Sequence, residues 1–286
     1  MSRNSRKIDT RAIGLDVSLA FARWLTGREH LHYGLWTGLE VTAANLLAAQ
    51  EAYSDRLLAL LPARAGLRIL DIGGGAGETA KRLIAAGHVV EIVVPSPFLA
   101  GRCAENAPEA VVHEMKFEDF RTEARFDVCL FSESFQYVPL AAALDGARAL
   151  LSPGGCIVIG DCFRAEGFRE DPLHATVGGG HPVADFHAAV RERGLSVAQE
   201  ADITAEVAPS VDLEQAFFNV IGHAVTRTDA ELAAKRPWVG KALRGLVRLV
   251  LGKRRQARLA RRLTEQTRNS EVFCAANRYL LLRLEP

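Results

Sequence analysis

Hydrophobic and polar positions change their period along the chain. Between residues 43 and 61, apolar residues recur every three or four positions, which predicts an amphipathic helix that ends before Pro62. From residue 67 onward, short runs rich in Val, Ile and Leu alternate with helical stretches. The pattern therefore predicts a helical N-terminal part, residues 13–62, followed by an alternating α/β part.

Seven apolar runs are predicted strands. They cover residues 67–72, 88–94, 110–115, 126–131, 156–160, 196–200 and 277–283. Helices are expected at residues 78–86, 97–106, 140–151 and 184–192, and a turn at 152–155. This alternation favours a doubly wound, mostly parallel seven-stranded sheet with right-handed crossovers, a fold that binds ligands beyond the carboxyl ends of its strands.

Helical sequence also lies between the last two predicted strands, where a minimal α/β domain does not need it. We therefore expect four parts: an N-terminal helical lid (1–62), a core (63–208), an inserted helical cap (209–270) and the final strand of the core sheet (271–286).

Composition places the chain among ordinary soluble globular proteins, with 49% hydrophobic and 24% charged residues. The start, Met1 to Arg11, is basic and polar with no apolar segment behind it, so we expect it not to be a secretory signal. The five cysteines show no metal-ligand spacing, which favours reduced thiols and a cytoplasmic protein.

Charge is distributed unevenly. The segment from Lys235 to Leu263 holds 11 Lys or Arg and no Asp or Glu, so with a net charge of +1 the rest of the chain carries −10. As a helix, residues 238–263 would set Val239, Ala242, Leu243, Leu246, Val247 and Val250 opposite Lys241, Arg244, Arg248 and Arg255. Such a helix either contacts an anionic membrane surface or packs on the body as a cap with a solvated basic face. No stacking aromatics interleave the charges, so we expect no nucleic-acid partner.

The first predicted strand runs into a glycine-rich turn, Asp71-Ile72-Gly73-Gly74-Gly75-Ala76-Gly77, which a helix follows. Glycines permit a positive φ and close approach of the backbone, and a helix start offers free N–H groups. Dinucleotide oxidoreductases use a related turn, so the turn alone indicates only a nucleoside-containing ligand.

The acid inside the strand and the Gly-x-Gly-x-Gly spacing resemble the class I S-adenosylmethionine (SAM)-dependent methyltransferases. The resemblance covers residues 68–163 and includes the helix start at 96–100, the adenine loop at 117–120, the fourth-strand motif at 126–139 and the turn at 150–155. It implies SAM as the cofactor. The residues it assigns to cofactor binding are Asp71, Gly73, Gly74, Gly75, Gly77, Val94, Pro95, Ser96, Lys116, Phe117, Glu118, Ser132 and Glu133. Glu133 has a second interpretation, as a cap for the following helix.

Two positions depart from the family pattern. Val94 stands where the family usually has the acid that binds the ribose hydroxyls, and strand alternation points Glu91 to the opposite face. Lys116 replaces the acid before the adenine loop. Loss of a charge-assisted ribose contact costs about 1.5–3 kcal/mol, or roughly tenfold to a hundredfold in affinity.

Outside the core, residues 31–36 resemble the aromatic segment of small-molecule methyltransferases that act on tocopherols, sterols, sugars or isoprenoids, and residues 201–207 resemble their segment after strand six. In that group these pieces fold over the cofactor and wall the acceptor site. The catalytic candidates are therefore His32, Tyr33 and Tyr137, where Tyr137 replaces the family's usual His. For each, packing of the loop or a hydroxyl bond to the backbone is the alternative.

Two other chemistries are disfavoured. Cyclopropane fatty acid synthases share the first helix and the core, but they are expected to have Glu-His where this chain has Gln136-Tyr137. His174, His181 and His187 surround three glycines without carboxylate or Cys partners at ligand spacing, so we expect a flexible loop and no metal.

The leading hypothesis is thus a SAM-dependent methyltransferase for a hydrophobic small molecule such as a lipid, isoprenoid or polyketide. The alternative is the same fold with altered or lost methyl transfer, motivated by Val94 and Lys116. The sequence does not indicate an oligomeric state.

Overall fold

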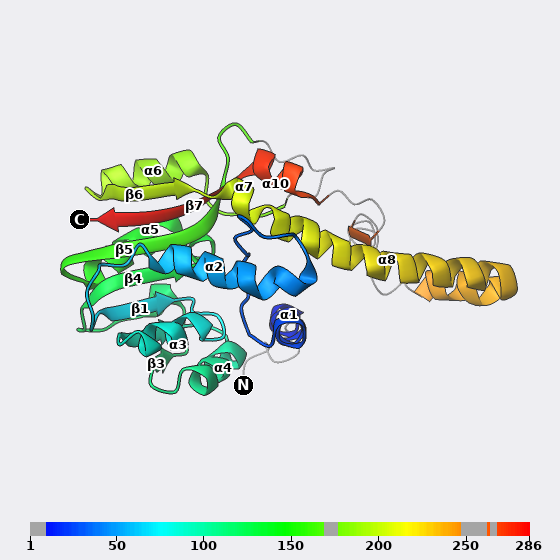
Figure 1. Ribbon diagram of the computed structural model, residues 1–286, viewed down its shortest axis with the longest axis horizontal. Helices are drawn as coiled ribbons and strands as arrows, with labels where there is room; N and C mark the ends of the chain where they lie inside the picture. Colours follow the sequence, from blue (N-terminus) through cyan, green and yellow to red (C-terminus); the bar gives the residue numbers. More distant parts are fainter. Residues whose placement is uncertain (1–9, 169–176, 247–261, 264–267) are drawn as a thin grey trace, which may run out of the picture.

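The computed structural model describes residues 10–168, 177–246, 262–263 and 268–286. Its centre is a seven-stranded sheet in the order β3-β2-β1-β4-β5-β7-β6 (Figure 1). The strands are β1 (Arg68–Ile72), β2 (Val89–Val93), β3 (Val111–His113), β4 (Phe126–Ser132), β5 (Leu151–Arg164), β6 (Ser196–Asp202) and β7 (Asn277–Glu285). All neighbouring pairs are parallel except those of β7, which runs antiparallel to β5 and β6. The predicted fold class is confirmed.

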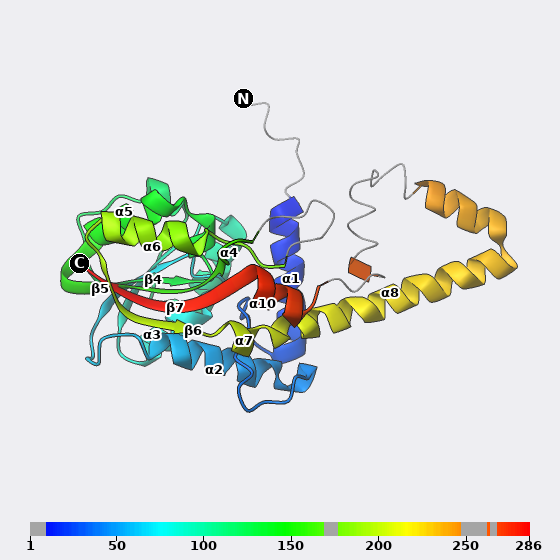
Figure 2. The same ribbon diagram turned by 90° about the horizontal axis from the view of Figure 1, so that it is seen from above.

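Helices cover both faces of the sheet (Figure 2). Between or after the strands come α3 (Glu78–Ala85), α4 (Pro97–Asn106), α5 (Leu140–Leu150), α6 (Val183–Glu192), α7 (Thr204–Val207), α8 (Pro209–Lys235) and α10 (Ser270–Ala276). Short 3-10 turns add η2 (Ala43–Asn45), η3 (Phe117–Asp119) and η4 (Phe135–Tyr137). The N-terminal part contributes α1 (Thr10–Thr26) and α2 (Leu46–Leu58), and residues 27–42 between them are not helical, although the pattern predicted a helical part over 13–62.

Strand alternation explains the two cores. In β4, Val128 and Leu130 face one core with α2, α3 and α4, whereas Cys129 and Phe131 face the other with α5 and α6. Because successive residues of a strand point to opposite faces, an apolar run is buried on both sides.

The fifth strand begins earlier than the sequence predicts. Residues 152–155 belong to β5, which starts at Leu151 directly after α5, instead of forming a separate turn. The physical reason is a bulge: Leu151 pairs with Phe126, and the register shifts before Val128 pairs with Cys156. Gly154 supplies the positive φ (74°) that this bulge requires.

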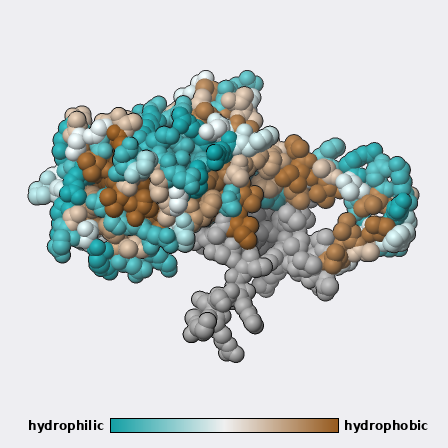
Figure 3. Space-filling view, turned by 90° about the horizontal axis from the view of Figure 1, so that it is seen from below, coloured by the Kyte–Doolittle hydropathy of each residue, from teal (hydrophilic) through white to brown (hydrophobic). Residues whose placement is uncertain are grey.

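After β6, the chain extends away from the sheet. α8 projects away from the sheet (Figure 1) and carries exposed apolar side chains (Figure 3), among them Val220 and Val225. Residues 237–246 are also helical, and Leu243 and Leu246 of the expected apolar face are exposed there. The remainder of the basic segment, apart from 262–263, lies outside the described residues. No helix in the described part of the chain is both long and apolar enough to cross a membrane.

Candidate functional site

The site lies at the carboxyl ends of β1 and β4, where the strand order reverses. β1 leads into residues 73–77, called the glycine turn below. Gly73, Gly75 and Gly77 have φ of 78°, 55° and 87°, a region that side chains with a Cβ rarely adopt. A Cβ on Gly74 would lie 2.7 Å from Asp71 Oδ2, so this position also needs glycine.

Asp71 lies beneath this turn with no exposed surface. Neither carboxylate oxygen has a hydrogen-bond partner within the described chain, and burial raises the pKa of the carboxyl to about 7. A buried carboxylate that lacks a protein partner is a candidate for interaction with a bound ligand.

The loop after β4 contacts the glycine turn directly. The Ser134 hydroxyl donates to the Ile72 carbonyl oxygen, and Ser134 Cβ leaves no room for a side chain on Gly73. Glu133 has a φ of 52°, the one positive φ of a non-glycine residue among the described residues. Such a conformation persists only where surrounding contacts hold it, and it is frequent at functional sites.

Contacts from the N-terminal part of the chain and from β7 hold Glu133 in this conformation. Residues 29–36, called the lid segment below, cross the carboxyl edge of the sheet, and the Tyr33 N–H donates to Glu133 Oε1 at 2.8 Å. The Tyr279 hydroxyl donates to the same oxygen at 2.7 Å, and its oxygen lies 2.9 Å from the Tyr53 hydroxyl oxygen. Burial outweighs these hydrogen bonds and raises the pKa of Glu133 to about 7.

His32 is held inside this arrangement. Its Nδ1 lies 2.9 Å from the Tyr33 carbonyl oxygen and must carry the proton, because a carbonyl only accepts. Its Nε2 faces His30 Nδ1 at 3.2 Å, and its ring stacks 4.6 Å from that of Tyr53. Burial, followed by repulsion from His30, lowers the pKa of His32 to about 3, so the ring is neutral at physiological pH.

The lid segment is fixed from a third side by α8. The Ser210 hydroxyl oxygen accepts the Gly34 N–H at 3.0 Å and the Trp36 Nε1–H at 2.8 Å. The Trp36 N–H donates to the Glu206 carbonyl oxygen of α7 at 2.9 Å. The two segments outside the core that the sequence singled out, 31–36 and 201–207, therefore meet at this edge.

The end of β2 is apolar. Val94 is 2% exposed and packs in the core, so it offers no carboxylate at this strand end. Ser96 instead accepts the Leu99 N–H and caps α4. Farther along, Lys116 is exposed and Phe117 is buried.

Not all predicted residues come together. The glycine turn, Glu133, His32 and Tyr33 form one cluster. Tyr137 ends the 3-10 turn η4 and is 66% exposed, so the structure places it at the surface. His181 contacts the Val138 carbonyl oxygen at 3.0 Å, whereas His187 faces Glu200 at 3.6 Å, and His174 lies outside the described residues.

Several site residues have no local signal in the sequence. Tyr53 and Tyr279 are 226 positions apart, and only the fold pairs their hydroxyls. Asp161 on β5 accepts the Gln136 N–H at 3.0 Å and its side-chain amide at 2.8 Å, which fixes the loop after β4. Strand periodicity marks Tyr279 and Asp161 only as buried positions.

Comparison with known proteins agrees with this geometry. The family model described as a methyltransferase domain matches residues 47–200. The 27-O-demethylrifamycin SV methyltransferase of Amycolatopsis mediterranei is 30% identical over 199 residues, which are 64% of this chain and 72% of that protein. The chain therefore belongs to the methyltransferase domain family.

Solved structures agree on the fold. Geranyl diphosphate C-methyltransferase from Streptomyces coelicolor superposes with a TM-score of 0.62 at 16% identity, covering 93% of this chain and 91% of that one. A cyclopropane synthase from Mycobacterium tuberculosis superposes with a TM-score of 0.64 at 18% identity, covering 98% and 100%. Family and fold together identify this chain as a class I SAM-dependent methyltransferase.

Proposed function

We propose that the chain transfers a methyl group from SAM to a hydrophobic small molecule at the carboxyl edge between β1 and β4. The observation that carries the proposal is the junction of three parts: the glycine turn, Glu133 and the lid segment. The Tyr33 N–H bond to Glu133 joins the lid to the strand end beside the turn, so a ligand held by the turn would lie next to the lid.

The residues present fit SAM at the turn. Close approach to the Gly73–Gly77 backbone and the unpartnered Asp71 carboxylate suit a ligand that carries a cationic amino acid group. Bound SAM would supply a methyl group activated by a sulfonium. Val94 offers the ribose only van der Waals contact, and Ser96, Lys116 and Glu118 are the polar groups we assign to that side.

The lid supports the choice of acceptor. Tyr33 packs edge-on against Phe273 at 5.8 Å and faces Tyr279 at 6.1 Å, so aromatic surface stands beside Glu133. Similar proteins act on a rifamycin and on geranyl diphosphate. We therefore favour an isoprenoid, polyketide or lipid acceptor that the lid encloses, which excludes water during an in-line displacement.

The chain's own groups have separate tasks in this scheme. Neutral His32 keeps the Tyr33 carbonyl in place, and Tyr33 lines the acceptor space. Glu133, whose pKa is about 7, can hold or release a proton near neutral pH. Tyr137, at the surface, stays a candidate for contact with the part of the acceptor that reaches outward. Membrane contact through 238–263 also stays a prediction.

The buried Val94 favours a second candidate, a protein of this fold that binds SAM or a related ligand without methyl transfer. Mass spectrometry separates the two. Protein, SAM and a panel of isoprenoid, polyketide and fatty acyl acceptors should give a product in which a methyl group replaces a hydrogen. Bound SAM without any product would favour the second candidate, and absence of SAM binding would contradict the first.

A further inference from the structure

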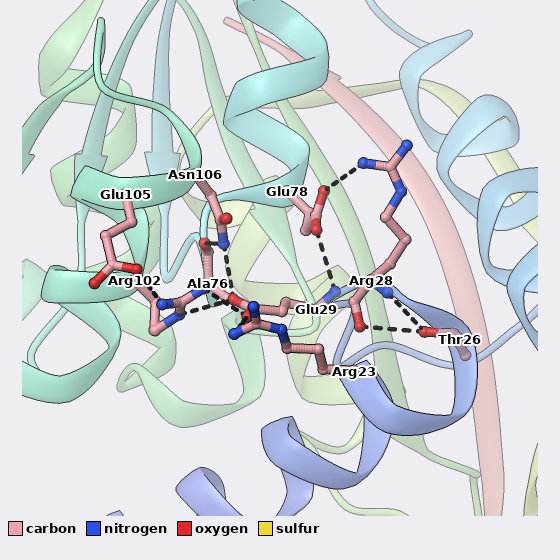
Figure 4. A network of polar contacts seen from close by, with 9 residues as sticks. All are labelled: Arg23, Thr26, Arg28, Glu29, Ala76, Glu78, Arg102, Glu105 and Asn106. Carbon is pink, nitrogen blue, oxygen red and sulfur yellow. Dashed lines mark hydrogen bonds and ion pairs between the residues drawn. The ribbon is translucent and has the colours of Figure 1, made fainter.

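Glu29 is a buried acid at the start of the lid segment, 5% exposed. Its carboxylate forms a two-bond ion pair with Arg102 of α4: Nε lies 2.9 Å from Oε2, and Nη2 lies 2.6 Å from Oε1 (Figure 4). This geometry is the strongest form of an arginine–carboxylate contact. Burial favours the neutral acid, but the bonds from Arg102 and Asn106 outweigh it and hold the pKa of Glu29 below its ordinary value.

One amide group connects Glu29 to the glycine turn. Asn106 Nδ2 donates to Glu29 Oε2 at 2.8 Å and to the Ala76 carbonyl oxygen at 2.8 Å. An amide nitrogen carries two hydrogens, so both bonds form together. Because Ala76 lies within the turn, the Asn106 side chain links Glu29 to the turn.

The backbone of Glu29 makes a second connection. Its N–H donates to Glu78 Oε1 at 3.1 Å, and Arg28 Nη1 lies 3.8 Å from Glu78 Oε2. Glu78 is the first residue of α3, directly after the turn. The lid segment is thus attached to both helices that flank the glycine turn (Figure 4).

We propose that Glu29 is a positioning residue that locks the lid segment to the glycine turn and thereby slows dissociation of the cofactor. The proposal rests on the proposed function, because it takes the turn as the cofactor site. A lid held at Glu29 cannot open without breaking the ion pair and the amide bridge, whereas the acceptor side of the lid, at Tyr33, depends on Glu133 instead.

Arg102 provides a matched control. It also pairs with Glu105, an acid of the same helix that is 66% exposed and has no contact with the lid segment among the described residues. Glu29→Gln and Glu105→Gln each remove one negatively charged partner of the Arg102 guanidinium. Stopped-flow release of S-adenosylhomocysteine, followed by the intrinsic tryptophan fluorescence of the protein, should be about tenfold faster or more in Glu29→Gln and within about twofold of wild type in Glu105→Gln. The KM for the acceptor should change little.

The partner residue gives a second variant. Arg102→Gln should speed release as Glu29→Gln does, and the double variant should be no faster than the faster single variant, because both changes break one contact. Additive effects, or equal effects of Glu29→Gln and Glu105→Gln, would overturn the proposal.

Hydrogen exchange of the ligand-free protein tests the Glu29 contact independently of the proposed function, because it needs no bound SAM. Amides of residues 29–36 and 73–77 should exchange faster in Glu29→Gln than in wild type or Glu105→Gln. Unchanged exchange there refutes the lock even if SAM binds. Faster exchange in a protein that binds no SAM keeps the lock and refutes the cofactor site.

Discussion

At the scale of single residues, Glu133 connects the lid segment to the final strand of the sheet. It accepts the lid backbone at Tyr33 and the hydroxyl of Tyr279 on the final strand. Its left-handed backbone, with φ of 52°, aims the carboxyl toward these partners. The hydrogen bonds of Glu133 to the lid segment and to Tyr279 therefore offset the free-energy cost of this backbone conformation and of burying the acid.

Ionisation of Glu133 should make stability depend on pH. Its pKa rises from 4.5 to about 7, so the folded state binds this proton more tightly than the unfolded state. The stability that the group contributes is complete below 4.5 and is lost as the pH rises through about 7. Glu133→Gln should thus lose less stability than wild type between these pH values, as measured by urea unfolding.

The exposed Glu109 is the control for that experiment. Glu109→Gln should follow the wild-type curve. Parallel pH curves for wild type and Glu133→Gln would show that Glu133 does not titrate in this range.

Individual residues were predictable only where a motif carries them. The glycine turn and Glu133 follow from the strand–glycine–helix pattern and from the motif after β4. Tyr137, which the fourth-strand motif marked as a catalytic candidate, ends η4 with its side chain at the surface, and its catalytic role stays a prediction. Glu29, Tyr53 and Tyr279 were not predictable, because their partners are distant in sequence and a single chain gives no sign of such pairs.

At the scale of elements, α2 lies over β5 at a position that only glycine fits. A Cβ on Gly160 would lie 2.6 Å from the Tyr53 hydroxyl and 3.0 Å from Leu57 Cδ1. The absence of a side chain on Gly160 therefore sets how closely the helix approaches the sheet. The same contact places the Tyr53 hydroxyl near Tyr279 and Glu133.

Gly160→Ala should therefore destabilise the protein by about 1–3 kcal/mol through overpacking. Gly101→Ala is the matched control, because its Cβ would meet nothing within 4 Å on the exposed side of α4. That substitution should stabilise by about 0.5–1 kcal/mol, since alanine favours a helix over glycine. Chemical unfolding measures both, and a neutral Gly160→Ala would contradict the packing of α2 on β5.

The elements themselves were largely predictable, because burial on both faces gives continuous apolar runs and amphipathic helices repeat at 3.6 residues. All seven strands occur where the pattern predicts them, with small changes at their ends except in β5, which extends beyond the predicted residues at both ends. The start of β5 was not predictable: Ser152-Pro153-Gly154-Gly155 has the composition of a turn, and only its pairing partner Phe126 makes the segment part of the strand.

At the scale of the whole molecule, two long-range features build the site. The reversal of strand order brings β1 and β4 side by side, which sets the glycine turn against the loop after β4. The lid segment crosses the same carboxyl edge, where contacts of Glu29, Glu133 and Ser210 fix it. Sequence predicted the first feature through the alternation of strands and helices, whereas the attachment points of the lid needed the fold.

The central claim is that the glycine turn binds SAM. Alanine substitutions at two glycines with similar backbone conformations test this claim. Gly75 and Gly87 have φ of 55° and 86°, and a Cβ on either would meet nothing within 4 Å. Alanine at each should therefore cost a similar backbone strain of about 1–2 kcal/mol, but only Gly75 lies in the turn.

Calorimetric titration with SAM and S-adenosylhomocysteine is the most direct measurement. Wild type and Gly87→Ala should bind both ligands with similar affinity, and Gly75→Ala should bind about tenfold more weakly or worse, because its methyl group would occupy the surface that the turn presents to the ligand. No binding by wild type at millimolar ligand, or equal binding by Gly75→Ala and Gly87→Ala, would contradict the account.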